Sequence, residues 1–149
     1  MTYAKHGNTP KPNRQQLYDA IVGKEDDIAI IVGRLLTTLG FKSNLTGTQY
    51  LKGAILYRYS NAQTVCVGMI TDTYKIVADK YNTVHTRVER AIRHSIINCY
   101  TNGDLKLFNE LVQASIIDEE FAPSNGEFIC SVVNWLQLEK LPRRDIGRE

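Results

Sequence analysis

Apolar residues recur at steps of three and four positions between residues 28 and 39, and this spacing constrains the fold more than any other feature of the chain. An α-helix carries residues at this spacing on one face, so the segment predicts an amphipathic helix that buries that face. Gly40 follows directly and is typical of a residue that ends a helix. The apolar positions are Ile28, Ile31, Val32, Leu35, Leu36 and Leu39.

The same spacing returns along the rest of the 149-residue chain and predicts an all-α, bundle-like fold of six helices. Ser124 and Glu127 form an S-x-x-E pattern, which is typical of a capping box at the start of the last helix. Residues 64–67 have strand-like propensity but no partner strand, so a loop or short helix is expected there. The other expected helices span about 46–59, 72–80, 84–101 and 104–116.

The two ends of the chain differ in composition from its middle. Residues 1–23 are polar and contain Pro10 and Pro12, so we expect a flexible basic arm, with a weak helix able to begin near Gln15. The folded domain is expected over 24–140. Pro142 ends the last helix, and residues 141–149 are expected to form a frayed tail.

Several function classes find no support in the sequence. No apolar run is long enough to cross a bilayer, and the first 16 residues lack the apolar core of a secretory signal. Cys66, Cys99 and Cys130 lack the spacing of a zinc site or disulfide framework, so three buried reduced thiols are expected. No Gly-rich phosphate loop or nucleophile–base arrangement is present. We therefore expect a cytoplasmic, non-enzymatic protein without metal or cofactor.

Charge is distributed unevenly, although the formal net charge is only +2. Residues 74–94 contain five Lys and Arg against Asp79 and Glu89. Residues 104–127 instead contain six acidic residues against Lys106. Such a distribution favours an oriented approach to a polyanion, with the basic segment leading.

Residues 86–100 separate charged from apolar side chains on a helical wheel. At 100° per residue the charged side chains fall within an arc of about 160°. The segment 72–80 and a short turn with Thr83 as expected N-cap precede it, which completes a helix-turn-helix pattern of support helix and recognition helix, the latter at about 84–101. A solvated basic face gives the same pattern. The charged residues are Arg87, Glu89, Arg90, Arg93 and His94.

The glutamate within this arginine cluster favours a sequence reader. Arginine can bond guanine O6 and N7 in bidentate fashion, and glutamate can accept a hydrogen bond from cytosine N4. A binder of phosphates alone gains nothing from Glu89, because the DNA backbone repels a carboxylate. Two structural roles remain open for Glu89: a capping box with Thr86, or an ion pair with Arg93.

Three segments carry a family resemblance: NTVHTRVERAIRHSI at 82–96, PSNGEFI at 123–129 and LQLEK at 136–140. Together they resemble the C-terminal effector domain of the sporulation master response regulator family, stage-zero sporulation protein A. The similarity covers about 24–140 in the same order of helices. It implies a six-helix DNA-binding domain whose fourth helix reads the major groove of boxes related to TGTCGAA, with copies bound head-to-tail on adjacent boxes.

The resemblance also implies which side chains meet DNA. Glu89 and Arg90 are expected at base edges, and the other charged residues of the arc divide between bases and phosphates. Weaker candidates for phosphate contacts are Lys75, Lys80 and Thr83. For His94 a structural role, capping or bridging a neighbour, is the alternative.

The chain departs from the family pattern at two points. The 23 residues ahead of the match are too few for the family's phosphoacceptor receiver, so control by aspartyl phosphorylation within this chain is not expected. Ile97 falls inside the polar arc, where the family usually has a polar residue. This side chain could contact a thymine methyl and change box preference, or could pack on Tyr50 or Tyr100.

The sequence thus predicts a stand-alone, phosphorylation-independent transcription regulator that binds double-stranded DNA, cytoplasmic and associated with the bacterial nucleoid. Two alternatives remain. The chain could compete with, or pair with, a full-length sporulation regulator, with RNA polymerase as a further partner. It could instead act only through protein contacts, using the acidic segment 104–127 and the last helix.

Overall fold

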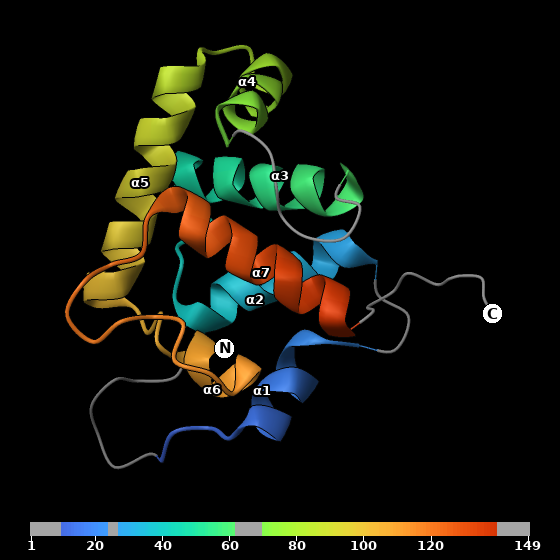
Figure 1. The fold of residues 1–149 in the computed structure, drawn as a ribbon, viewed down its shortest axis with the longest axis vertical. Helices are drawn as coiled ribbons and strands as arrows, with labels where there is room; N and C mark the ends of the chain where they lie inside the picture. The colour runs from blue at the N-terminus through green and yellow to red at the C-terminus, as the bar shows by residue number, and fades with distance from the viewer. Residues whose placement is uncertain (1–9, 24–26, 62–69, 140–149) are drawn as a thin grey trace.

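The computed structural model describes residues 10–23, 27–61 and 70–139. These residues form seven α-helices and no strand, so the predicted all-α class is confirmed (Figure 1). The helices are α1 (Arg14–Ile21), α2 (Ile28–Leu39), α3 (Thr46–Asn61), α4 (Ile70–Lys80), α5 (His85–Asn102), α6 (Leu107–Val112) and α7 (Asn125–Glu139). Helices α4 and α5 correspond to the expected support and recognition helices.

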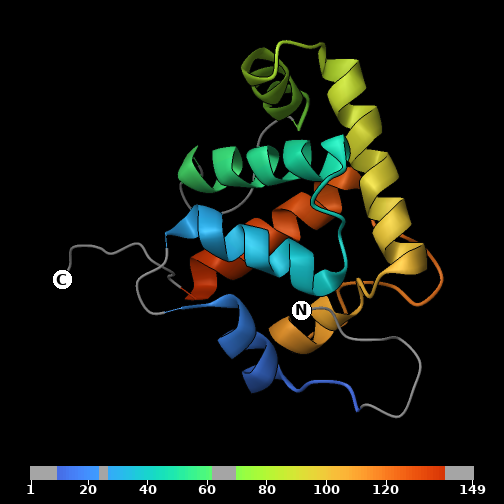
Figure 2. The same ribbon diagram turned by 180° about the vertical axis from the view of Figure 1, so that it is seen from behind.

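Helix α5 runs along one side of the molecule, with α4 at its N-terminal end and α6 near its C-terminal end (Figure 1). Helix α3 packs against α2, α4, α5 and α7, and so stands at the centre of the fold (Figure 2). Phe128 of α7 lies in the core with its ring centroid 5.7 Å from that of Phe41 and 5.9 Å from that of Phe108. The apolar stripes read from the sequence therefore meet in one core, against which one side of α5 is held.

Helix α1 is the seventh helix, which the expectation of six did not include. The arm expected over 1–23 allowed a weak helix to begin near Gln15, and α1 is that helix; the expected flexibility of residues 14–21 is wrong, because Leu17 and Ile21 are buried in the core. Asn13 accepts a hydrogen bond from the Gln16 amide at 2.9 Å and the Gln16 side chain bonds back, which forms a capping box. Burial of each apolar side chain contributes about 1.5–3 kcal/mol, enough to fix a short helix whose surroundings are polar.

Two predicted helix ends are confirmed. Gly40 has φ 101° and ends α2, and the amide of Phe41 donates to the carbonyl of Leu36 at 2.9 Å. At α7 the Ser124 amide donates to Glu127 Oε1 at 2.9 Å, and the Glu127 amide donates to Ser124 Oγ at 3.1 Å. This reciprocal pair is the predicted capping box.

Helix α6 is shorter than the expected 104–116. Its last residue is Val112, and Gln113 follows at φ 60°. The side chain of Asn109 explains the early end, because its Oδ1 accepts from the amides of Ile116 at 2.8 Å and Ile117 at 2.7 Å. These bonds give the backbone after α6 a non-helical set of partners.

The cysteines only partly follow expectation. Cys99 is a buried thiol that donates to the carbonyl of Leu39 at 3.1 Å. Cys130 is disulfide-bonded, so the expectation of a reduced thiol is wrong there. A disulfide depends on the distance between two cysteines in the folded protein, and their spacing in the sequence does not give this distance. Cys66 and the strand-like stretch 64–67 lie outside the described residues. Among the helices described, none has the length and hydropathy needed to span a membrane.

Candidate nucleic-acid interface

A tight corner joins α4 to α5. Asn82 has φ 58°, its amide donates to the carbonyl of Asp79 at 3.3 Å, and the amide of Thr83 donates to that of Ala78 at 2.9 Å. This is the hydrogen-bond pattern of a Schellman motif, and asparagine tolerates the left-handed conformation that it needs. The N-cap of α5 is Val84 without a side-chain bond, so the prediction of Thr83 as N-cap is wrong.

One face of α5 packs on the core as the helical wheel predicted. Its buried residues are Val88, Ile92, Ser95, Ile96 and Cys99. Gly47, in the first turn of α3, lies against the backbone of α5 so closely that a Cβ there would overlap the carbonyl oxygen of Ala91. The glycine therefore allows α3 to fix the position of α5 by direct backbone contact.

The opposite face of α5 is exposed and charged. The carboxylate of Glu89 has no hydrogen bond or ion pair among the described residues, and Thr86 lies inside the helix, so neither structural role considered for Glu89 is formed. Ile97 is 42% exposed, although it is a large apolar side chain. The exposed members of the predicted set on this helix are Arg87, Glu89, Arg90, His94 and Ile97.

Arg93 differs from the other charged residues of the arc. It is half-buried, and its Nη1 donates to the carbonyl of Pro123 at 2.5 Å. Pro123 lies in the segment before α7, 30 positions along the chain. This guanidinium therefore holds the start of α7 against α5.

Sequence reasoning missed Asn125, the first residue of α7. Its side chain is buried, and Nδ2 donates to Tyr74 Oη of α4 at 3.1 Å and to the carbonyl oxygen of Glu89 at 3.0 Å. Burial raises the pKa of Tyr74 above 10.0, with a smaller increase from Glu89, while the hydrogen bond from Asn125 and the charge of Arg93 oppose the shift. The only sequence signal was the motif PSNGEFI, which pointed to a helix start rather than to this residue.

These residues surround a cleft of about 630 Å³ between α4, α5 and the start of α7. It is lined by Ile70, Tyr74, Thr86, Glu89, Arg90, Arg93, Ser124, Asn125 and Gly126. A hollow of about 680 Å³ elsewhere, between α2 and α3, is lined by none of the residues predicted from the sequence. The charged cleft is therefore the hollow that borders the predicted interface.

The support helix adds two exposed cations, Lys75 and Lys80. The Nζ of Lys80 lies 5.8 Å from the ring centroid of Tyr81, in the corner between α4 and α5. Thr83 in the same corner is half-buried. Lys75 and Lys80 therefore lie on the helix that precedes α5, and Thr83 lies in the corner that joins the two helices.

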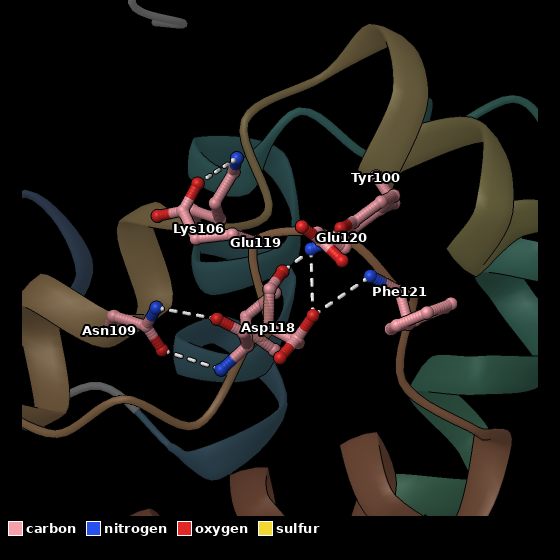
Figure 3. A network of polar contacts seen from close by, with 8 residues as sticks. Tyr100, Lys106, Asn109, Asp118, Glu119, Glu120 and Phe121 are labelled. Carbon is pink, nitrogen blue, oxygen red and sulfur yellow. Dashed lines mark hydrogen bonds and ion pairs between the residues drawn. The ribbon is translucent and has the colours of Figure 1, made fainter.

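Part of the acidic segment forms a network of polar contacts with Tyr100, near the C-terminal end of α5 (Figure 3). Tyr100 donates its hydroxyl to the carbonyl of Asp118 at 2.9 Å, and Asp118 Oδ2 accepts from the amides of Glu120 at 2.7 Å and Phe121 at 3.0 Å. Lys106 forms an ion pair of 3.2 Å with Glu119, whose hydrogen bond raises the pKa of the lysine. The turn holds Phe121 at 72% exposure.

Comparison with known protein families gives a match to the model described as "Sporulation initiation factor Spo0A C terminal", over residues 32–136. The match begins in α2 and ends in α7, and so includes the corner, the charged face of α5 and the segment before α7. This family is one of DNA-binding effector domains of a sporulation response regulator and not one of enzymes. The chain belongs to the Spo0A C-terminal domain family.

Proposed function

We propose that this chain binds double-stranded DNA in a sequence-specific manner through the exposed face of α5 and thereby regulates transcription. The observation that carries the proposal is a set of charged side chains on one exposed helix face, directly after a tight corner. The side chains of Arg87, Glu89, Arg90 and His94 have no partner among the described residues, so their charged groups are available to a ligand.

The charged groups divide by chemistry into base readers and phosphate binders. We assign Arg90 to the N7 and O6 atoms of guanine and Glu89 to the N4 amino group of cytosine. Each such bond of good geometry contributes about 1–3 kcal/mol of discrimination against the wrong base. Boxes related to TGTCGAA contain adjacent C·G and G·C pairs, which suit a neighbouring glutamate and arginine.

The remaining residues are proposed to position the protein on DNA. Lys75, Lys80 and Thr83 border the face and suit phosphates, as do Arg87 and His94 where they do not reach a base. Arg93 is proposed as a minor contact, because it would have to give up its bond to Pro123. Ile97 is proposed to contact a thymine methyl, since its exposed side chain lies on the same face.

The folded unit is proposed to span 24–140 together with α1, between the arm at 1–13 and the tail at 141–149. The chain is further proposed to act without phosphorylation, because no other part of the described chain covers the charged face of α5. Copies would bind head-to-tail on adjacent boxes in the cytoplasm, at the nucleoid. A chain bound there would also exclude a full-length sporulation regulator from the same box, so competition follows from the same activity; a contact with RNA polymerase is a further proposal.

A gel-shift titration over salt tests this proposal. The wild-type protein is expected to prefer a duplex with a TGTCGAA-type box over a scrambled duplex, with affinity that falls steeply as salt rises. Arg90→Ala is expected to lose about tenfold or more of this preference. Lys42→Ala removes an exposed cation between α2 and α3 and serves as the matched control. Equal affinity of the wild-type protein for both duplexes would refute sequence-specific binding.

A protein-contact function is the second candidate, and the exposed Phe121 within the acidic turn favours it. Large exposed aromatic side chains are typical anchors of protein interfaces. In that case the wild-type protein shows no DNA binding even at low salt. The gel shift therefore separates the two candidates in one experiment.

A further inference from the structure

We infer that Asn125 is a positioning residue that sets the placement of α5 relative to α4, and with it the selectivity for DNA sequence. This inference rests on the proposed function. It assigns no DNA contact to Asn125 itself, which is buried at the first position of α7. Asn125 lies at the junction at which α4, α5 and α7 meet.

The chemistry of the junction requires an amide. The Nδ2 group of Asn125 carries two hydrogens, and one goes to Tyr74 Oη while the other goes to the carbonyl of Glu89. The other amide atom, Oδ1, is buried without a partner among the described residues. The side chain is therefore held by its two donors, and neither aspartate nor alanine can supply them.

The bond to Glu89 acts on the residue proposed to read cytosine. Asn125 holds the main chain of Glu89, while the carboxylate of the same residue has no partner among the described residues and extends from the exposed face. One turn further along α5, Arg93 is bonded to Pro123. The segment 123–125 is therefore hydrogen-bonded to α5 at two successive turns on one side of the helix. These two bonds oppose rotation of α5 about its axis.

The bond to Tyr74 fixes the other half of the corner. Tyr74 is a buried residue of α4, so the same amide ties the support helix to the recognition helix. Bidentate base contacts lose strength when a side chain is displaced by a fraction of an ångström, whereas phosphate attraction depends only weakly on such a shift. Loss of the amide is therefore expected to weaken binding to the correct box and to leave binding to other DNA unchanged.

The test compares the ratio of the dissociation constants for scrambled and box duplexes, at a temperature where circular dichroism shows each variant folded. Asn125→Ala is expected to lower this ratio about tenfold, through weaker binding of the box alone. Asn125→Asp is expected to lower it at least as much, because a carboxylate cannot donate to the Glu89 carbonyl. Asn13→Ala is the matched control: it also replaces an amide side chain at the start of a helix, where it removes the capping bond to the Gln16 amide of α1, and the ratio is expected to stay at the wild-type value.

Folded Asn125→Ala protein with the wild-type ratio would overturn the inference while leaving the proposed function intact. An equal loss of the ratio in Asn13→Ala would also overturn it, since selectivity would then follow helix stability. If Asn125→Ala does not fold, Tyr74→Phe removes only the hydroxyl acceptor and is expected to lower the ratio about threefold; an unchanged ratio there overturns the inference. A wild-type protein without preference refutes the proposed function, and this inference with it.

Discussion

The contact between Gly47 and α5 yields the sharpest stability prediction. In Gly47→Ala the new Cβ would overlap the carbonyl oxygen of Ala91 and lie 2.8 Å from its carbonyl carbon and 3.1 Å from Ser95 Cβ. Relief requires α3 and α5 to separate, because two of these three atoms belong to the backbone. Overpacking of this kind costs about 1–3 kcal/mol, and a backbone neighbour favours the upper end. Alanine recovers at most about 1 kcal/mol through its better helix propensity.

We therefore expect Gly47→Ala to lower the free energy of unfolding by about 2 kcal/mol, seen as a Tm lower by about 4–8 °C in a thermal scan. Gly126→Ala is the matched control, since a Cβ there meets nothing within 4 Å. That variant should be as stable as the wild-type protein or slightly more stable. A Gly47→Ala protein with wild-type stability in urea titration would refute the account of how α3 fixes α5.

Three further predictions concern single side chains. Glu89→Ala should lose about tenfold discrimination at one C·G pair of the box in competition gel shifts, yet bind scrambled DNA no more weakly, because the carboxylate repels phosphates. Leu17→Ala should lower the free energy of unfolding by about 2–5 kcal/mol in urea, since this side chain of α1 is fully buried; a change below 0.5 kcal/mol would mean that α1 does not pack on the core. The pKa of Tyr74 is raised on folding. The protonated phenol therefore contributes to the free energy of unfolding below pH 10, and this contribution is lost as pH rises through the folded-state pKa. The stability difference between wild type and Tyr74→Phe should therefore shrink in alkaline urea titrations, and a difference that grows there would contradict a raised pKa.

The long amphipathic helices could be read from the sequence because their signals are local. The stripe at 28–39 with Gly40, and the two faces of residues 86–100, need only helical periodicity and an end signal. Helix α1 could be expected only as a weak helix near Gln15, because the segment is too short to give a clear helical period. The burial of Leu17 and Ile21 is set by packing on the rest of the folded core. Helix α6 was extended too far because the hydrogen bonds of Asn109 to residues 116 and 117 do not show in periodicity.

The sequence predicted the exposed residues of the candidate site but not the buried contacts that hold α5 in place. Arg87, Glu89 and Arg90 follow from a wheel drawn on one segment. The junction depends on pairs far apart in sequence: Arg93 with Pro123, and Asn125 with Glu89 and Tyr74, the last pair 51 positions apart. Such pairs are set by how α4, α5 and α7 pack, and a single sequence does not specify this packing.

The most direct test of the central claim, that the exposed face of α5 reads DNA sequence, is a crystal structure of this chain bound to a duplex selected from a random DNA pool. We expect α5 in the major groove, with the Arg90 guanidinium on guanine O6 and N7 and the Glu89 carboxylate within hydrogen-bond distance of cytosine N4. A complex in which these two side chains face solvent, or in which another element enters the groove, would contradict it.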